Sequence, residues 1–491
     1  MNLVSGGNFR ELWSHHSLPD HKDMTLDFLD RLRAITPYVL TGTDTASYAR
    51  DWIGKYEAEP IAVVRPATTA EVSDILALCN DTSTVVVPMG GNTGLTGATL
   101  AKGAIILSLE RMNTIRDVRK EAKIAIVEAG VILQDLHDHL DGSGLKYPMT
   151  FGAKGSCRIG GTLGTNAGGS NVLRYGNTRD LCLGIEVVLA DGRILDLMSE
   201  LHKDNSGYDL RDLIIGSEGT LGVITAAVLK LAPAPKAHAT AMVTVPDLSG
   251  ALQLLNALQE RTGGMVEAFE YMPRNYMHRL KAYRPDLVPP LGYDAEHTIF
   301  LEIASTIPRD CAEDDTGEIP LTTHLEDALG TMFEAGLVLD AALAGSEAQR
   351  RTMWEMREAA AEVSTNTKPL VINDLCLPVD QVAAFCDEAI ARIRRLDAGA
   401  VDCTVAHLGD GNVHYTVYPS KDNGELSDKI METVEDIVQE MHGSFSAEHG
   451  IGISKLSSMR RRKSPVALDV MRAIKASMDP NGILNPGKVL P

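Results

Sequence analysis

Short apolar runs alternate with helical patterns through the first half of the chain. The run IAVVRP (61–66) predicts a strand, and Thr69 is expected to cap a helix that begins near Glu71, where apolar positions recur at helical spacing. A helix with a polar lead-in is expected at 24–58, and further strands at 85–88, 104–109 and 122–130. Because the alternation continues to about Pro233, it predicts an α+β domain of more than 170 residues.

A linker and a second unit follow. The stretch LAPAPKAHA (231–239) combines two prolines with small residues, which is typical of a linker. After it we expect strands at 241–246 and 297–305, a helix at 248–262, helical patterns at 323–363, two strands around a polar turn at 401–419, helices at 425–442 and 465–478, and a turn at 479–488. We therefore predict three parts, namely 1–235, 236–440 and a C-terminal helical segment at 441–491 that completes the active site.

The charge balance narrows the classes of partner. The chain has 491 residues, 46 Lys and Arg against 66 Asp and Glu, and a net charge of −20. This length allows two or three domains. The negative charge argues against nucleic acid or an anionic membrane surface as a partner. An anionic substrate would need a local positive site, supplied by a metal, an Arg or a helix N-terminus.

Targeting and redox signals are few. No run of about 18 apolar residues predicts a membrane span. The N-terminus carries Asp20, Asp23 and Asp27 without the basic-then-apolar layout of a secretion signal. Seven scattered cysteines without a CxxC pair predict reduced thiols, no cysteine-held iron–sulfur cluster, and a cytoplasmic compartment, or the mitochondrial matrix in a eukaryote.

Two glycine-rich loops carry the first functional signal. Pro88–Gly97 has four glycines within eight residues, and Gly152–Gly169 has seven within eighteen. Glycine costs backbone entropy unless bare backbone is needed, and closely spaced N–H groups can wrap a diphosphate. Tight turns alone could explain one such loop, but two in one domain favour a diphosphate-bearing cofactor. Neither reads GxGxxG, so a Rossmann site is not expected.

These loops, with RYGN (174–177) and GSEGTLGVIT (216–225), resemble the FAD domain of the vanillyl-alcohol oxidase superfamily. Together with C-terminal motifs described below, the sequence from about Tyr48 to Pro491 is most similar to the FAD-dependent D-2-hydroxyacid dehydrogenases, a group that includes D-lactate and D-2-hydroxyglutarate dehydrogenases. The resemblance implies an α+β fold, with a PCMH-type FAD-binding domain and an α+β cap built on an antiparallel sheet.

The resemblance also implies how FAD is held. The two loops would bind its pyrophosphate, the strand after Gly219 would pass the flavin, and Asn485 would reach back to it. Some members tether the flavin through a His in the first loop, but this loop has no His, Cys or Tyr, so we expect non-covalent FAD. The expected FAD-binding residues are Pro88, Gly90, Gly91, Asn92, Thr93, Gly94, Leu95, Gly97, Pro148, Gly152, Ser156, Gly160, Gly161, Asn166, Gly168, Gly169, Tyr175, Gly176, Gly219, Val223, Ile224 and Asn485.

A second constellation lies near the C-terminus. His407 and His414 flank a Gly-Asp-Gly turn in HLGDGNVH, and Glu448 and His449 follow in SAEHGIG. Two His and one carboxylate with an open position are typical of catalytic zinc, and also fit Fe²⁺, Mn²⁺ or Co²⁺. Taken alone, the two His could instead be strand-end residues that bond to backbone. The resemblance implies that His407, His414 and Glu448 bind the metal and that His449 is the base.

The implied reaction oxidises a small anionic D-2-hydroxy acid to the 2-keto acid. The acid would chelate a Lewis-acid metal, which lowers the pKa of its hydroxyl, and His449 would remove the hydroxyl proton. The Cα hydrogen would leave as a hydride to flavin N5. Asn412 is expected to contact the substrate. The electrons would pass to an external acceptor, which is an electron-transfer flavoprotein, a quinone or a cytochrome, and a homodimer is one option for the assembly.

The substrate-tail region departs from the family pattern. Members that act on dicarboxylates carry an Arg at the place of Arg357, a Thr one helical turn later, and a Lys before the next strand's Asn/Tyr-Asp pair. Here those last two positions are Ala361 and Ile372. We therefore expect Arg357 to contact the substrate, and the substrate tail to be shorter or less polar than that of 2-hydroxyglutarate.

Two other functions share this flavin fold. One is an ether-lipid-type transferase like alkylglycerone-phosphate synthase, which uses FAD without net oxidation. The other is a non-catalytic flavin subunit of a multi-subunit dehydrogenase. The set His407, His414 and Glu448 argues against the first, and the intact Glu-His-Gly motif argues against the second.

Overall fold

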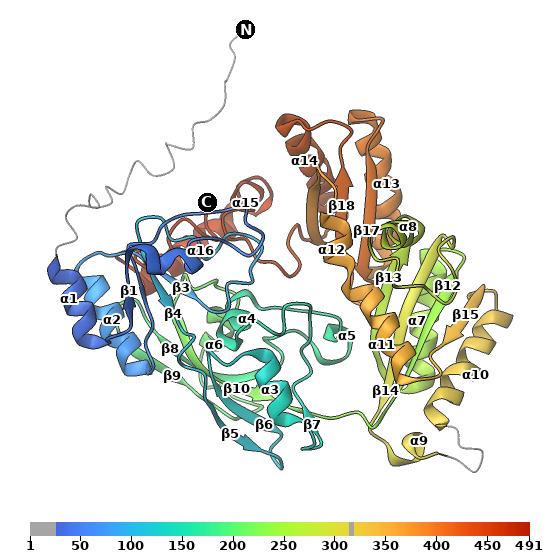
Figure 1. Ribbon diagram of the computed structural model, residues 1–491, viewed down its shortest axis with the longest axis horizontal. Coiled ribbons are helices and arrows are strands. Elements are labelled where there is room, and N and C mark those ends of the chain that lie inside the picture. Colours follow the sequence, from blue (N-terminus) through green and yellow to red (C-terminus); the bar gives the residue numbers. More distant parts are fainter. Residues whose placement is uncertain (1–25, 314–318) are drawn as a thin grey trace, which may run out of the picture.

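The protein divides into two lobes joined by a short extended segment (Figure 1). The computed structural model describes residues 26–313 and 319–491. The expectation that the N-terminus is no secretion signal therefore concerns residues outside the described part. Within that part, no helix has the length and apolar character needed to cross a bilayer.

The first lobe contains two larger sheets, which its helices accompany. A four-stranded sheet has the order β1 (Val39–Leu40), β2 (Ala62–Val64), β4 (Ile105–Ser108) and β3 (Val86–Met89), with the last three strands parallel. An antiparallel sheet has the order β5 (Ile115–Arg119), β6 (Ile124–Glu128), β10 (Val223–Lys230), β8 (Cys182–Val188) and β9 (Ile194–Leu197). A small ribbon pairs β7 (Leu145–Lys146) with β11 (Ala232–Pro233). The helices are α1 (Leu26–Ile35), η2 (Gly42–Tyr48), α2 (Thr69–Asp81), α3 (Leu133–Leu140), α4 (Ile159–Thr165), α5 (Val172–Tyr175) and α6 (Leu210–Ile214).

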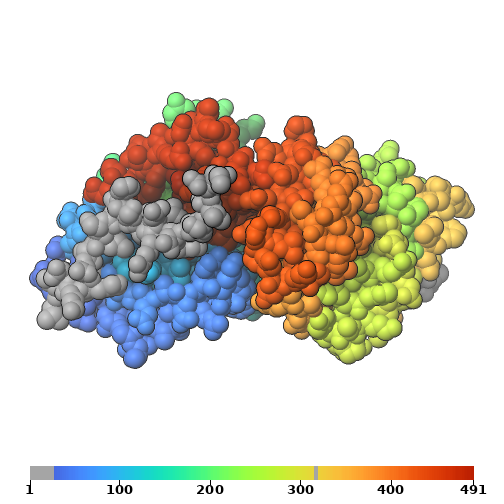
Figure 2. All heavy atoms as spheres, turned by 90° about the horizontal axis from the view of Figure 1, so that it is seen from above, coloured from blue at the N-terminus to red at the C-terminus, as the bar shows by residue number. Residues whose placement is uncertain are grey.

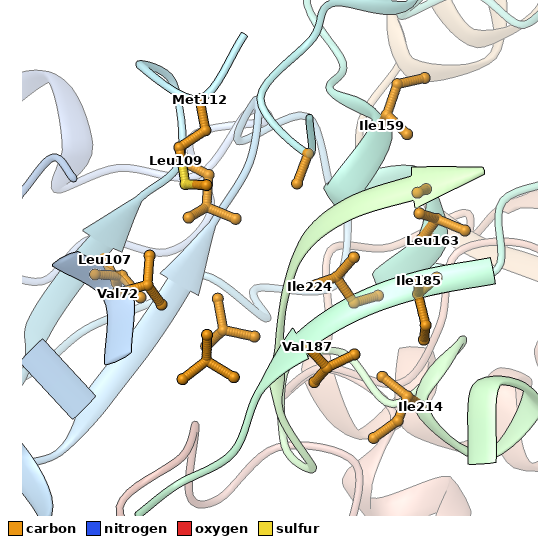
Figure 3. Close-up of a cluster of buried hydrophobic side chains, with 14 of the residues drawn as sticks. Val72, Leu107, Leu109, Met112, Ile159, Leu163, Ile185, Val187, Ile214 and Ile224 are labelled. Carbon is orange, nitrogen blue, oxygen red and sulfur yellow. The ribbon is translucent and has the colours of Figure 1, made fainter. Parts of the chain in front are cut away.

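Helix α2 shows how local sequence and core packing agree. Its N-cap is Thr68 rather than the expected Thr69, because the Thr68 hydroxyl accepts the backbone N–H of Glu71 at 3.1 Å. Its apolar stripe, which includes Val72 and Ile75, is fully buried in the core of the first lobe. Figure 3 shows part of this core, in which Val72 lies beside Leu107.

The second lobe is built on one antiparallel sheet. Its order is β15 (Asp340–Leu343), β12 (Ala237–Val245), β14 (His297–Ser305), β13 (Val266–Pro273), β17 (Val401–His407), β18 (Asn412–Tyr418) and β16 (Val371–Cys376). One face packs on α7 (Leu248–Thr262), α10 (Pro320–Glu334), α13 (Val382–Leu396) and α14 (Gly424–Glu440). The other packs on α8 (Arg274–Tyr283), α11 (Glu347–Glu358) and α12 (Ala360–Thr365). Two short helices, α9 (Pro308–Cys311) and η3 (Val379–Gln381), complete the lobe. The expected antiparallel cap is thus present.

The helical pattern expected at 323–363 is interrupted. Helices α10, α11 and α12 cover most of it, but strand β15, which was not expected, separates α10 from α11 and pairs with β12 at the edge of the sheet. Alanine and leucine favour helix only weakly as a prior, and pairing with an open strand edge overrides that preference here.

The C-terminal segment returns to the first lobe. After α15 (Leu456–Arg462) and α16 (Pro465–Met478), the chain runs beside β3, where Val86 exchanges backbone hydrogen bonds with Ile483 and Asn485. In Figure 2 this red segment lies over the first lobe and adjoins the orange part of the second. On either side of the linker, Leu231 belongs to the core of the first lobe and Ala237 to the core of the second. The expected domain limits stay a prediction.

Candidate functional site

The two glycine loops meet backbone to backbone. A Cβ on Gly90 would lie 3.3 Å from the Cα of Gly161, and one on Gly91 would lie 2.1 Å from the carbonyl oxygen of Ser156. Any side chain at Gly91 would therefore push the loops apart. Gly90 and Gly91 are therefore needed for the close crossing of the two loops, whether or not a diphosphate lies beside them.

A cavity opens where the loops meet the strand after Gly219. The residues that were expected to bind FAD and line it are Pro88, Gly90, Gly160, Gly161, Gly219, Val223, Ile224 and Asn485. The expected residues that do not line it are Gly91, Asn92, Thr93, Gly94, Leu95, Gly97, Pro148, Gly152, Ser156, Asn166, Gly168, Gly169, Tyr175 and Gly176. Sequence reasoning missed Ser217, Glu218 and Thr165 as lining residues, although the first two lie inside the quoted GSEGTLG motif.

Unpartnered polar atoms in this cavity fit a dinucleotide. Ser217 Oγ and Asn485 Oδ1 are buried, and neither has a hydrogen-bond partner in the described chain. A buried polar atom without a partner costs about 1–3 kcal/mol, so such atoms point to a ligand that completes their bonding. The amide of Asn485 is oriented by its Nδ2, which donates to the carbonyls of Ala98 and Glu218.

Two of the expected FAD residues have structural partners instead. Asn166 is the left-handed C-cap of α4, and its Oδ1 accepts the backbone N–H of Arg179 at 2.9 Å. The Tyr175 hydroxyl donates to Glu267 of the second lobe. The geometry thus gives Asn166 a capping role and Tyr175 an interlobe contact.

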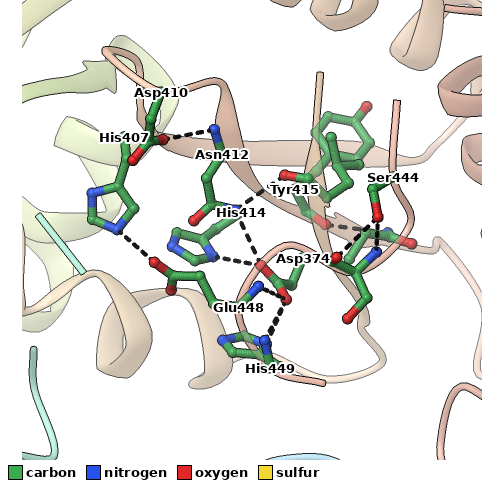
Figure 4. Close-up of polar contacts among 12 residues, drawn as sticks. Asp374, His407, Asp410, Asn412, His414, Tyr415, Ser444, Glu448 and His449 are labelled. Atoms are coloured by element: carbon green, nitrogen blue, oxygen red, sulfur yellow. Dashed lines mark hydrogen bonds and ion pairs between the residues drawn. The ribbon is translucent and has the colours of Figure 1, made fainter. Parts of the chain in front are cut away.

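The second constellation is assembled on the sheet of the second lobe. Strands β17 and β18 form a hairpin in which His407 pairs with Asn412, and this brings the rings of His407 and His414 to 5.4 Å between centroids. Glu448 enters from the loop after α14, with Oε1 3.8 Å from His407 Nε2 (Figure 4). The ligand atoms of His407, His414 and Glu448 all lie within 4.8 Å of one another.

The turn between the two His touches the first lobe. A Cβ on Gly409 would lie 2.7 Å from Leu173 of α5. A Cβ on Gly168, in the second glycine loop, would lie 2.9 Å from Glu448 Oε1. The second glycine loop and the candidate metal ligand Glu448 are therefore neighbours across the lobe interface.

The charge pattern of this set fits a cation. The Glu448 carboxylate makes no hydrogen bond to any residue that the structure describes, and its burial raises its pKa to about 7. Burial, with His407 close by, holds the pKa of His414 well below its ordinary value, which leaves this imidazole neutral. Burial would lower the pKa of His407, but Glu270 raises it above its ordinary value. A metal at this set would therefore displace protons from Glu448 and His407, while His414 is already in the neutral form that binds a metal.

A buried ion pair supports His407 from behind. Arg357 Nε donates to Glu270 Oε2 at 2.6 Å, and His407 Nδ1 lies 2.9 Å from Glu270 Oε1. Burial alone would raise the pKa of Glu270, but Arg357 and His407 lower it to about 2, so it stays ionised. A carboxylate on one ring nitrogen orients the other toward a metal. Sequence reasoning missed Glu270, which lies 137 residues from His407.

The expected substrate residues border this set. Arg357 is buried on α11 and its Nη2 lies 3.2 Å from the His407 ring, so it is not an exposed helix residue. Asn412 donates to Asp374 and to the carbonyl of Leu375, while its Oδ1 is buried without a partner among the described residues. This free acceptor is available to a ligand.

Another group of possible ligands lies farther along the same sheet. His238, Glu267 and Glu302 also bring ligand atoms within 4.8 Å of one another. Their carboxylates already have partners: Glu267 pairs with Lys146 and Arg174 of the first lobe.

A glycine cradle for a dinucleotide and an antiparallel sheet carrying His and carboxylate ligands define a two-lobe flavoprotein oxidoreductase. The FAD binding domain family matches residues 60–198, and the family of FAD linked oxidases, C-terminal domain, matches residues 234–489. The chain belongs to the FAD-dependent D-2-hydroxyacid dehydrogenase family of these flavoproteins.

Relatives cover most of the chain. It is 38% identical over 460 residues to a probable mitochondrial D-2-hydroxyglutarate dehydrogenase of Oryza sativa subsp. indica, covering 92% of this chain and 79% of that protein. It is 33% identical to the D-2-hydroxyglutarate dehydrogenase of Stutzerimonas stutzeri, covering 92% and 96%. The expected function, FAD-dependent oxidation of a D-2-hydroxy acid, is confirmed, and neither alternative is favoured.

Solved structures confirm the fold class. The p-cresol methylhydroxylase structure matches with a TM-score of 0.71 at 16% identity, over 95% of this chain and 98% of that one. An alkyldihydroxyacetonephosphate synthase matches with a TM-score of 0.67 at 18% identity, over 94% and 84%. At these identities the likeness concerns the fold alone.

Proposed function

We propose that this dehydrogenase activates its substrate at a divalent metal bound by His407, His414 and Glu448, with His449 as the base and zinc as the first candidate ion. The observation that carries the proposal is the position of the unneutralised Glu448 carboxylate, between two His rings and against the flavin loop at Gly168. Two His and a carboxylate leave coordination positions open for a substrate.

The chain's own residues then have separate tasks. Bound FAD supplies the hydride acceptor, and a bound metal would supply the Lewis acidity that acidifies the substrate hydroxyl. His449 stacks on His414 at 5.8 Å between ring centroids, so it lies beside the proposed metal ligands, where it would receive the hydroxyl proton. Asn412 lies beside this set with its Oδ1 free for a ligand contact, and Arg357 contributes positive charge for the substrate carboxylate.

We further propose that the substrate tail is shorter or less polar than that of 2-hydroxyglutarate. Ile372 lies two residues before Asp374 on β16, so it shares the site's face of the sheet, and it is 43% exposed there. Ala361 is exposed on α12, and Arg357 is engaged by Glu270. A tail carboxylate would lose hydrogen-bonding partners, each worth about 1.5–3 kcal/mol, or roughly one to two decades in affinity.

The surroundings of the reaction complete the proposal. An external acceptor, which is an electron-transfer flavoprotein, a quinone or a cytochrome, would take the electrons, in a cytoplasmic or mitochondrial-matrix compartment. Support comes from the seven cysteines, which are all free and therefore supply neither a disulfide nor a clustered iron–sulfur ligand set. A homodimer stays one option for the assembly.

An anaerobic flavin-reduction screen tests the substrate and metal together. Purified enzyme is mixed with D-lactate, D-2-hydroxybutyrate, D-malate and D-2-hydroxyglutarate, and with the L-isomers, with and without EDTA. We expect the 450-nm band to bleach with D-isomers only, fastest with a monocarboxylate, and slowly after metal removal. Full activity after verified metal removal would refute the metal set, and fastest reduction by D-2-hydroxyglutarate would refute the tail proposal.

A further inference from the structure

Asp374 is a buried carboxylate at the centre of the site to which no role has yet been given. It lies on β16 opposite His414, and it is 1% exposed. Figure 4 shows its side chain between His414 and the loop that carries Glu448 and His449. A carboxylate in such a place is costly unless donors surround it.

Donors from both motifs do surround it. Oδ2 accepts the backbone N–H groups of Glu448 at 3.1 Å and His449 at 2.9 Å. Oδ1 accepts Nδ2 of Asn412 at 3.1 Å. Lys455 Nζ lies 3.4 Å from Oδ2 and supplies the balancing positive charge. One side chain therefore ties the loop of the base to the strand of the substrate-contact residue.

The two imidazole rings are arranged around the same carboxylate. His449 Nδ1 lies 3.4 Å from Asp374 Oδ2, and His414 Nδ1 lies 3.9 Å from Asp374 Oδ1. The rings are close to parallel, at 17°. A carboxylate at Nδ1 favours the tautomer that carries its proton there, which leaves the lone pair on Nε2. Both rings thereby turn Nε2 away from Asp374.

Asp374 is also close enough to be a ligand itself. Its carboxylate and the rings of His414 and His449 bring ligand atoms within 4.8 Å of one another. Yet both its oxygens already accept N–H groups, whereas the Glu448 carboxylate accepts none from the described residues. Binding a metal through Asp374 would break the bonds that hold the loop of Glu448 and His449.

We propose that Asp374 is a positioning residue of the dehydrogenase reaction, whose charge orients His449 through Nδ1 and whose hydrogen bonds anchor the loop of Glu448 and His449 to the sheet. The proposal rests on the roles proposed above for His449 and the metal ligands. Asparagine cannot replace it, because an amide places an NH₂ group against donors where the carboxylate offers a second acceptor.

The test compares Asp374→Asn with Glu302→Gln, a buried carboxylate on the same sheet whose partners are Arg350, Thr240 and Trp354. We expect Asp374→Asn to keep FAD but to reduce it about 10–100-fold more slowly at saturating D-hydroxy acid, with a metal dissociation constant raised by a similar factor. Glu302→Gln should change neither value more than about twofold. A wild-type rate and metal affinity in Asp374→Asn would overturn the proposal.

A double variant separates positioning from structural damage. At saturating metal, adding Asp374→Asn to His449→Ala should slow flavin reduction by less than about threefold, because the base that Asp374 positions is already absent. A further loss equal to that of the single variant would contradict positioning. A wild-type rate in His449→Ala alone would instead refute the proposed base and leave Asp374 untouched as an anchor of the loop.

A measurement on the wild-type chain does not depend on whether a variant folds. ¹⁵N-histidine spectra of the holoenzyme, with the His449 signals assigned by their loss in His449→Ala, should show the tautomer protonated at Nδ1. The tautomer protonated at Nε2 would overturn the proposal.

Discussion

Two groups of His and carboxylate side chains that share no residue lie along the sheet of the second lobe, and they differ in how fully their carboxylates are bonded. His407, His414 and Glu448 lie at one end of the lobe interface, while His238, Glu267 and Glu302 lie farther along the same sheet. In both groups the ligand atoms approach within 4.8 Å of one another. Geometry alone therefore does not distinguish them.

The partners of the carboxylates do distinguish them. Glu267 is bonded to Lys146, Arg174 and Tyr175, and Glu302 takes a two-pronged contact from Arg350. Glu448, in contrast, accepts no hydrogen bond from the described residues, and Nε2 of His407 lies 3.8 Å from its carboxylate.

The comparison indicates that closely spaced ligand atoms suit a metal only where the protein's own cations do not already neutralise the carboxylates. Where Lys or Arg side chains already neutralise the carboxylates, a metal would have to break these ion pairs. This would leave the Lys or Arg charge buried without a partner, which is costly. The second group is better described as an interlobe ion-pair cluster.

The largest effect is expected from the base beside the first group. His449→Ala should slow flavin reduction by a D-hydroxy acid by about 10²–10⁴-fold, because the hydroxyl proton loses its acceptor. Stopped-flow absorbance at 450 nm measures the rate. His238→Ala, the matched histidine of the second group, should stay within about twofold of wild type; a comparable loss there would erase the distinction.

Measuring the bound metal in variants of Glu448 and Glu267 compares the two carboxylates directly. Glu448→Gln should weaken metal binding by more than about 100-fold, since it removes a ligand rather than an outer partner. Glu267→Gln should keep the wild-type metal stoichiometry. Elemental analysis after dialysis against a graded chelator series measures both. Equal metal loss in the two variants would show that the second group binds metal as well.

A double substitution tests whether the missing polar residues near the first group limit the use of D-2-hydroxyglutarate. Introducing Ala361→Thr and Ile372→Lys together should raise the preference for D-2-hydroxyglutarate over D-lactate by about 10–100-fold, because a tail carboxylate then gains a cation and a hydroxyl donor. The ratio of kcat/KM values measures it. Ile372→Met, which adds length without charge, is the control, and an equal gain in that control would contradict an electrostatic cause.

The smallest effect concerns stability and its dependence on pH. Burial would raise the pKa of Glu267, but Lys146, Tyr175 and Arg174 hold it below its ordinary value of 4.5. A carboxylate with a lowered pKa stabilises the fold above about pH 4.5, and this stabilisation is lost as the pH falls through the folded-state value. Glu267→Gln should therefore lower the free energy of unfolding by about 1–3 kcal/mol at pH 7.

Thermal melts from pH 7 to pH 3 measure this effect. The wild type and Glu267→Gln should converge toward the acid end, because the wild type loses the interlobe ion pairs there. Parallel curves would mean that the ion pairs do not stabilise the fold.

Local signals predicted several elements closely. Helix α16 was expected at 465–478 and is found at Pro465–Met478, with Pro465 in the first turn where its missing N–H costs nothing. The strands around the Gly-Asp-Gly turn were also expected, and they form β17 and β18. Strand β15 was not foreseen, because its conformation depends on pairing with β12, about a hundred residues earlier.

The sequence by itself determined the glycine cradle, the His-flanked turn and the Glu-His pair, since each depends on residues that are neighbours in the chain. Folding alone brings Glu270 to His407 and Asp374 to His449, and it leaves the Glu448 carboxylate without a hydrogen bond from the described residues. Glu270 and His407 are 137 residues apart, and Asp374 and His449 are 75 apart. The charge state of a buried group depends on every donor that folding brings near it, and spacing along the chain does not contain that information.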